Sequence, residues 1–219
     1  MKRLYNLLLI VLLPLVAGAQ DDRVQGMPRE VYYLMPEFGQ GLIYFDNMAP
    51  ARGMLNICAV DHTLRFMDRD GKEKVSSDDS HIVRVQIDSA VFVHDLGAYY
   101  RLYPVSPEVS LALRREVQVL RDAKQGAYGM NSRTSSIKEY TSVSADGVVY
   151  SLDRDKEYPY EVSETLFLYC DRGIVSFNKK QLRKCFPERR EAIDTWFAAG
   201  HRLPVNLPEA LETLSAFVQ

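Results

Sequence analysis

The sequence predicts a mainly β protein, with α+β as the limiting description, and three patterns support this prediction. Across residues 41–103, short runs of alternating apolar and polar residues are separated by Asp, Asn, Gly and Ser. In the clearest run, Val83, Val85 and Ile87 share one side of a two-residue period, which is typical of an antiparallel sheet with one wet face. The period becomes helical only after Asn178. We therefore expect an antiparallel meander that forms a curved sheet or a partly closed barrel, with a short C-terminal helical tail.

The first strands of the meander are predicted from the turn signals between them. Apolar runs at residues 42–45, 54–60 and 64–67 each end at an Asp. Asp70-Gly71 is a strong signal for a hairpin turn. The segment Val31–Met35 precedes these runs and is also strand-like, and the proline after it forces a bend. We therefore expect a further strand there.

The second half of the sheet is predicted to contain a long half-buried strand over residues 109–119. Arg115 falls on its apolar side, where a guanidinium is costly unless it is paired. A bulge or a sheet end that turns Arg115 outward is the favoured explanation, and a carboxylate partner is the alternative. Residues 124–136 are expected to form a surface loop. Further strands are expected at residues 137–143, 147–152, 161–170 and 174–177.

The tail is predicted to contain three short helices. Asn178 is a suitable N-cap for the first, the second covers residues 187–200, and the third covers residues 208–218. Helices this short are marginal alone, so they must bury their apolar faces. We expect Trp196 and Phe197 to pack the tail on the sheet, and a partner-binding helix face is the alternative.

Residues 1–19 have the pattern of a signal peptide. The chain starts with two basic residues, continues with an apolar centre over residues 7–16, and then has the small residues Ala17-Gly18-Ala19. The apolar run is shorter than the roughly 20 residues of a membrane span, and no Cys follows it for a lipid anchor. We therefore expect cleavage after Ala19, export to the periplasm or the cell surface, and no transmembrane segment in the mature chain.

The predicted mature chain consists of an antiparallel β domain, residues 20–177, and a helical tail, residues 178–219, that packs on it. The whole chain has 27 basic and 29 acidic residues, so without Lys2 and Arg3 the formal charge is 25 − 29 = −4. Binding to nucleic acid needs a clustered basic surface, so nucleic acid is not expected as a partner. A protein or an envelope component remains as a partner, and the oligomeric state is left open.

The three cysteines, Cys58, Cys170 and Cys185, are too few for a disulfide scaffold. Export would permit oxidation, and a bridge between Cys170 and Cys185 would join the last strands to the first helix. The alternative is that all three are buried thiols that act as small apolar side chains. The sequence leaves both interpretations open, because it does not fix the geometry that a disulfide needs.

No reaction motif is found, and no catalytic residue, cofactor or metal is assigned. The histidines His62, His81, His94 and His201 lack the spacing of metal ligands, although sheet pairing could bring two of the first three together. The chain has no Gly-x-Ser-x-Gly elbow and no Cys-His motif, and pairs such as Asp78-Asp79 arise freely among 29 acidic residues. These observations argue against an enzyme without deciding the question.

Four segments of the predicted β region carry a resemblance: Tyr33–Phe38, Gly41–Phe45, Met54–Asn56 and Leu64–Asp68. Together they resemble a family of small exported proteins of Bacteroidota that has no assigned activity. The chain departs from the family pattern at Asn47-Met48, where an Asp-Gly turn is usual. The resemblance implies the fold and export, and it implies no catalytic residues.

The tyrosine content is the one sign of a binding surface. The chain has 13 tyrosines, and 12 remain without Tyr5 of the signal peptide. Tyr suits half-buried sheet positions and also binding surfaces, and a binding face is expected first at Tyr99, Tyr100, Arg101 and Tyr103. The functional hypothesis is an exported, non-catalytic binding or structural module of the cell envelope. The alternatives are a small-ligand carrier with a pocket inside a curved sheet, and a hydrolase whose site assembles only in the fold.

Overall fold

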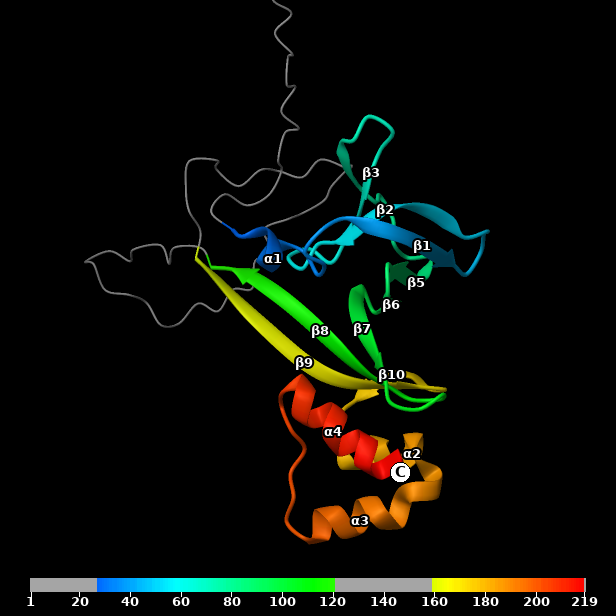
Figure 1. Ribbon diagram of the computed structural model, residues 1–219, viewed down its shortest axis with the longest axis vertical. Helices are drawn as coiled ribbons and strands as arrows, with labels where there is room; N and C mark the ends of the chain where they lie inside the picture. Colours follow the sequence, from blue (N-terminus) through cyan, green and yellow to red (C-terminus); the bar gives the residue numbers. More distant parts are fainter. Residues whose placement is uncertain (1–26, 121–158, 219) are drawn as a thin grey trace, which may run out of the picture.

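The computed structural model describes residues 27–120 and 159–218, and within them ten strands form one antiparallel sheet (Figure 1). The sheet is curved and does not close on itself, so the predicted mainly β fold is confirmed in its curved-sheet form. The strands are β1 (Gly39–Phe45), β2 (Ala51–Ile57), β3 (Leu64–Met67), β4 (Glu73–Val75), β5 (Ile82–Ile87), β6 (Ala90–Asp95), β7 (Ala98–Pro104), β8 (Ser110–Val119), β9 (Tyr160–Cys170) and β10 (Gly173–Ser176).

The helices of the described residues are short. They are α1 (Arg29–Tyr32), α2 (Lys179–Cys185), the 3₁₀ turn η1 (Pro187–Arg189), α3 (Arg190–Ala198) and α4 (Leu207–Val218). A membrane span would need a longer and more apolar helix than any in this part of the chain. The signal peptide, the loop at residues 124–136 and the strands expected at residues 137–143 and 147–152 lie outside the described residues.

The strand order in the sheet is β10-β9-β8-β7-β6-β5-β1-β2-β3-β4. Neighbours in the chain are neighbours in the sheet, except for β4 and β5: β5 pairs with β1, which thus lies between β5 and β2, and β4 lies at the edge. Curvature brings the connection between β2 and β3 to β8, where the N–H of Val117 donates to the carbonyl of Ala59 at 3.0 Å. Two strands far apart in the sheet order are thereby linked, and the residues that follow Ala59 lie beside β8.

The prediction of a strand over Val31–Met35 is wrong in its first half, which is the one-turn helix α1. The carbonyl of Pro28 accepts the N–H of Tyr32 at 3.0 Å, so the turn begins at this proline. The fixed φ of proline favours the start of a helical turn over an extended segment. Extended structure begins only at Tyr33, which forms an isolated antiparallel bridge with Cys58.

The expected common face of Val83, Val85 and Ile87 is wrong at Val83. The pairing of β1 with β5 shifts register at Tyr44, so Ile82 takes the inward position in place of Val83. Ile82 is buried, whereas the side chain of Val83 is 42% exposed. An extra residue in one strand turns every residue before it to the opposite face of the sheet. Alternation in the sequence alone does not reveal this change.

Arg115 is not turned outward by a bulge in the ladder between β8 and β9. The ten residues of β8 pair with β9 without a register shift, and Arg115 lies opposite Glu164. The Nε atom of Arg115 lies 3.9 Å from Oε1 of Glu164. The bulge is therefore wrong. The ladder of β7 with β8 ends at Leu113, so Arg115 does lie beyond the end of that ladder, and it also faces a carboxylate.

The helical region packs on one face of β8 and β9, at the lower end of the sheet in Figure 1. The predicted N-cap is confirmed, because the side chain of Asn178 accepts the N–H of Gln181 at 3.0 Å. Trp196 and Phe197 border the shared apolar cluster, and the ring of Trp196 lies edge-on to that of Phe217 at 5.6 Å. The buried residues of this cluster are Val109, Leu111, Leu166, Leu168, Cys170, Leu182, Cys185, Phe186, Ile193, Ala210, Leu214 and Phe217.

The cluster also brings Cys170 of β9 and Cys185 of α2 together. Both thiols are buried, and their Sγ atoms are in contact at 2.6 Å. We predict that oxidation joins them into a disulfide that closes a loop of about 15 residues, which stabilises a protein by about 3 kcal/mol in the chain-entropy model. Thiol titration in denaturant should then find one free thiol, that of Cys58, after oxidative purification and three after reduction.

Peptide mapping by mass spectrometry should identify the bridge, and Cys58→Ala is the control that leaves it in place. Three free thiols after exposure to a glutathione redox buffer of oxidising composition would contradict this prediction.

Candidate functional site

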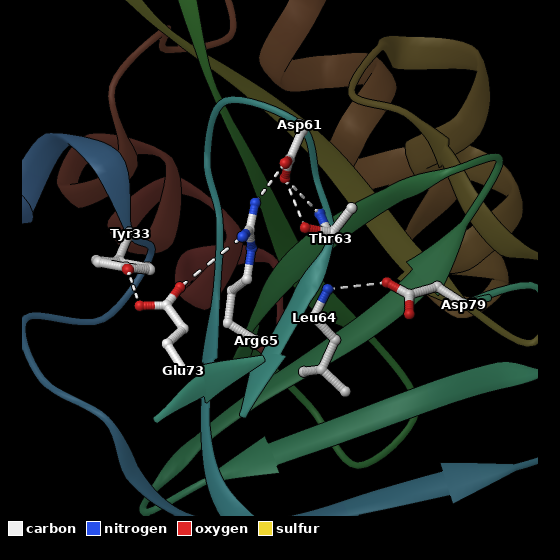
Figure 2. A network of polar contacts seen from close by, with 7 residues as sticks. All are labelled: Tyr33, Asp61, Thr63, Leu64, Arg65, Glu73 and Asp79. Atoms are coloured by element: carbon white, nitrogen blue, oxygen red, sulfur yellow. Dashed lines mark hydrogen bonds and ion pairs between the residues drawn. The ribbon is translucent and has the colours of Figure 1, made fainter. Parts of the chain in front are cut away.

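The most unusual side chain in the sheet is Arg65 of β3, which is only 1% exposed. Figure 2 shows its guanidinium between two carboxylates. Its Nη2 atom lies 2.5 Å from Oδ2 of Asp61, and its Nη1 atom lies 3.9 Å from Oε1 of Glu73. The hydroxyl of Tyr33 donates to Oε2 of Glu73 at 2.6 Å. A buried charge is tolerated only when it is paired and hydrogen-bonded. The two carboxylates supply the pairing, and Asp61 also accepts a hydrogen bond, whereas Nε of Arg65 has no hydrogen-bond partner among the described residues.

Asp61 links the guanidinium of Arg65 to the loop between β2 and β3. Its second oxygen, Oδ1, accepts the N–H of Thr63 at 3.0 Å and the hydroxyl of Thr63 at 2.7 Å. His62, between them, has a φ of +54°, in the left-handed region that residues other than glycine rarely adopt. Asp61 contacts Arg65 with one oxygen and Thr63 with the other. The Arg65 ion pair therefore fixes Asp61, and Asp61 and Thr63 together hold His62, which lies between them, in this conformation.

Asp79 holds the opposite side of the same region. Its Oδ2 atom accepts two hydrogen bonds of 2.9 Å, from the N–H of Leu64 and from the hydroxyl of Tyr99. Burial, and then the charge of Asp79, raise the pKa of Tyr99, so this hydroxyl stays protonated and remains a donor. The other oxygen of Asp79, Oδ1, is buried and has no hydrogen-bond partner among the described residues.

Between these two anchors lies a hollow of about 560 Å³, which we call the polar hollow. Its lining comes from the connection between β2 and β3, the segment before β5, and the turn between β6 and β7. The lining residues are His62, Thr63, Ser76, Ser77, Asp78, Asp79, Ser80, Ile82, Val83, His94, Asp95, Leu96 and Gly97. Hydroxyl, carboxylate and imidazole groups therefore meet in one place, although they come from three separate segments.

The fold brings His62 and His94 into this hollow and leaves the other strand histidine, His81, outside it beside Asp46. Nδ1 of His94 lies 3.2 Å from the carbonyl of Ile82. A carbonyl only accepts, so Nδ1 of His94 carries a proton in this contact.

The imidazole of His62 is held neutral by its surroundings. Burial lowers its pKa, although Nε2 lies 3.8 Å from Oε1 of Glu116, whose charge acts in the opposite direction. Within residues 27–120 and 159–218, no three His, Cys, Asp or Glu side chains are grouped so that they could hold a metal ion. The polar hollow therefore offers hydrogen-bond acceptors, and the described residues give it no group of metal ligands.

The charge of the polar hollow is negative. Its lining includes Asp78, Asp79 and Asp95 and contains neither lysine nor arginine. Hydrogen bonds from the side chain and the N–H of Ser80 lower the pKa of Asp78, which keeps that carboxylate ionised. Arg114, whose charge acts on His62, is itself paired with Glu116.

The rim of the hollow is apolar and strained. Leu96 is 93% exposed and forms, with Gly97, the two-residue turn between β6 and β7. Both residues have positive φ, +48° at Leu96 and +75° at Gly97. Two-residue hairpin turns of this kind favour Asn, Asp or Gly at both positions, so a leucine here is unfavourable locally. Val83, which the bulge turns outward, lines the same hollow.

The four residues predicted as a binding face do not share one face. Tyr99 is fully buried toward the meander core, and Tyr100 is 3% exposed on the opposite side of β7, edge-on to Phe167 at 5.2 Å. The guanidinium of Arg101 lies over the ring of Tyr103 at 5.3 Å from its centroid. Of the four, Tyr99 contacts the polar hollow: its hydroxyl donates to Asp79, and its ring centroid lies 4.6 Å from that of His94.

Sequence reasoning missed the polar hollow as a site, because its residues come from three segments. One local signal could have indicated it. In the turn between β6 and β7, Leu96 precedes Gly97 at a position that normally takes Asn, Asp or Gly. Local misfits of this kind tend to occur at functional positions.

Comparisons with protein-family models, with curated proteins and with solved structures found no match to this chain. A function must therefore be inferred from the geometry of the polar hollow.

The ion pair of Arg65 should make a large contribution to stability. Arg65→Met keeps an apolar stem but leaves the carboxylates of Asp61 and Glu73 without their cation. We expect the free energy of unfolding to fall by about 3–5 kcal/mol, the range for breaking a buried pair, in urea denaturation followed by circular dichroism.

Lys74→Met is the matched control. Lys74 pairs with Asp68 at 3.7 Å in the hairpin of β3 and β4, but this pair is solvent-accessible, so stability should change little. Equal stability losses in Arg65→Met and Lys74→Met would show that burial does not set the value of the Arg65 pair.

The lowered pKa of His62 predicts a pH dependence of stability. The unfolded chain takes up a proton at this residue near the usual pKa of about 6.5, whereas the folded protein does so only at lower pH. Stability should therefore fall as the pH is lowered from 7.5 to 5.5. His62→Asn tolerates the left-handed backbone and should reduce this loss, which denaturant unfolding at both pH values would measure.

His201→Asn, at an exposed histidine of the helical region, is the control and should keep the pH dependence of the wild type. An identical pH dependence in His62→Asn and the wild type would contradict the assignment.

Proposed function

We propose that this protein is an exported, non-catalytic binding module of the cell envelope that holds its partner at the polar hollow. One observation carries the proposal: an almost fully exposed leucine, Leu96, stands on a strained backbone at the rim of a hollow lined by polar groups. Strained positions persist where the surrounding structure holds them, and they cluster at binding and catalytic sites. Export is proposed from residues 1–19 and from the family resemblance.

The chemistry of the hollow favours binding over the two alternatives. A carrier pocket encloses most of its ligand, whereas this hollow is open to the surface and includes serine and aspartate in its lining. A hydrolase of the serine type needs a nucleophile hydrogen-bonded to a base. Within the described residues, neither His62 nor His94 makes a hydrogen bond to Ser76, Ser77 or Ser80.

One observation keeps a hydrolase as a second candidate. The neutral imidazole of His62 and the carboxylate of Asp79 line the same hollow as several hydroxyls, and a neutral imidazole can accept a proton. Such an enzyme would have to bring its nucleophile to the base on binding substrate. Turnover measurements separate this candidate from a binding module.

Blocking the hollow tests the proposal whatever the chemical class of the partner. Ser77 is exposed, and we expect Ser77→Trp to fill the hollow without disturbing the core. Ser176→Trp, at an exposed site on β10, is the matched control. The labelled protein is applied to an array of peptides, envelope polysaccharides and phospholipids, and affinity for the bound class should fall at least about tenfold in Ser77→Trp alone, equivalent to about 1.4 kcal/mol.

Two results would overturn the proposal. Binding that is equally strong in Ser77→Trp and the wild type would place the partner elsewhere. Turnover of chromogenic ester, glycoside or peptide substrates that is lost in His62→Asn would replace the binding module with the hydrolase.

A further inference from the structure

We propose that the partner of the polar hollow is a polypeptide segment in which a lysine or arginine is flanked by apolar side chains. The cationic group enters the hollow, and an apolar neighbour packs on Leu96. This inference rests on the proposed function and adds the chemical class of the partner.

Charge complementarity favours a cationic partner. Three carboxylates line the hollow without a lysine or arginine, and the pKa of Asp78 is lowered so that it is ionised. The imidazole of His62, which could offset them, is held neutral. A hollow of one charge sign attracts ligands of the opposite sign, so anionic lipids, nucleic acids and acidic peptides are repelled.

The hydrogen-bonding groups of the hollow lead to the same class. Asp79 lines the hollow, and its Oδ1 atom is buried and unpartnered among the described residues. A buried acceptor without a donor is costly, and a bound donor would satisfy it. Ammonium offers three donors and guanidinium five, and neither has an acceptor, so both complement this set.

Leu96 distinguishes a polypeptide from a small amine. Asp88, in the turn between β5 and β6, also has a positive φ, +50°, but belongs to a residue type that tolerates this conformation. Leu96 tolerates it poorly and gains no burial within the described fold, because 93% of it is exposed. Contact with an apolar side chain of a partner would account for a leucine at this position, and a free polyamine supplies no such contact.

The test uses short blocked peptides and purified protein. Acetyl-Leu-Lys-Leu-amide is titrated against the protein, with the imidazole signals of His62 and His94 followed by NMR. We expect saturable shifts with a dissociation constant of about 1 mM or tighter, and at least tenfold weaker binding of the Gln-centred and Glu-centred peptides. Acetyl-Gly-Lys-Gly-amide should also bind more weakly, because it lacks the apolar neighbours.

Two variants separate the charge from the apolar contact. Asp79→Asn should weaken binding of the Leu-Lys-Leu peptide at least tenfold, and Asp95→Asn tests the charge again if Asp79→Asn fails to fold. Leu96→Asn should weaken the Leu-Lys-Leu peptide but not the Gly-Lys-Gly peptide. The same substitution should raise the melting temperature by about 2–4 °C, because Asn suits the left-handed turn.

Val205→Asn, at an exposed residue of the helical region, is the matched control and should change neither quantity. Equal binding of the Lys and Gln peptides, or no saturable shift with any lysine peptide up to about 10 mM, would overturn this inference. Array binding that is lost in Ser77→Trp would still support the proposed function in that case, so the two failures are distinguishable.

Discussion

The buried ion pair between Arg65 and Asp61 is the constraint on which the site depends. An arginine inside a sheet is tolerated only with a carboxylate fixed against it, and Asp61 has one oxygen on Arg65 and the other on Thr63. Asp61 therefore anchors the connection between β2 and β3 to the buried guanidinium of Arg65, and breaking this ion pair would cost free energy of folding. His62 adopts its left-handed backbone as a result, and it faces the polar hollow from there.

The curvature of the sheet supplies the second element of the site. A flat sheet of this strand order would keep β2 far from β8, whereas the curved sheet links Ala59 to Val117 by a backbone hydrogen bond. Glu116 of β8 then lies beside His62, and burial at this junction keeps the imidazole neutral. The polar hollow is thus a consequence of curvature as much as of the residues that line it.

Two departures from regular β structure give the hollow its apolar rim. The bulge at Tyr44 turns Val83 outward, and the turn after β6 presents Leu96 on a strained backbone. Neither feature improves the sheet itself, because each exposes an aliphatic side chain. A protein that binds a partner at this rim would gain from both departures, since each places an apolar contact beside the polar groups.

The sequence by itself determined the features that depend on neighbouring residues. The shared face of Val85 and Ile87, the hairpin turn at Asp70-Gly71 and the cap at Asn178 follow from a two-residue period and from turn and capping chemistry. Tertiary structure alone decided the placement of β1 between β5 and β2, the inward phase of Ile82 and the partner of Arg115. It also decided the meeting of His62 with His94 and the burial of Tyr99 and Tyr100, because sheet order and curvature join residues that no local signal connects.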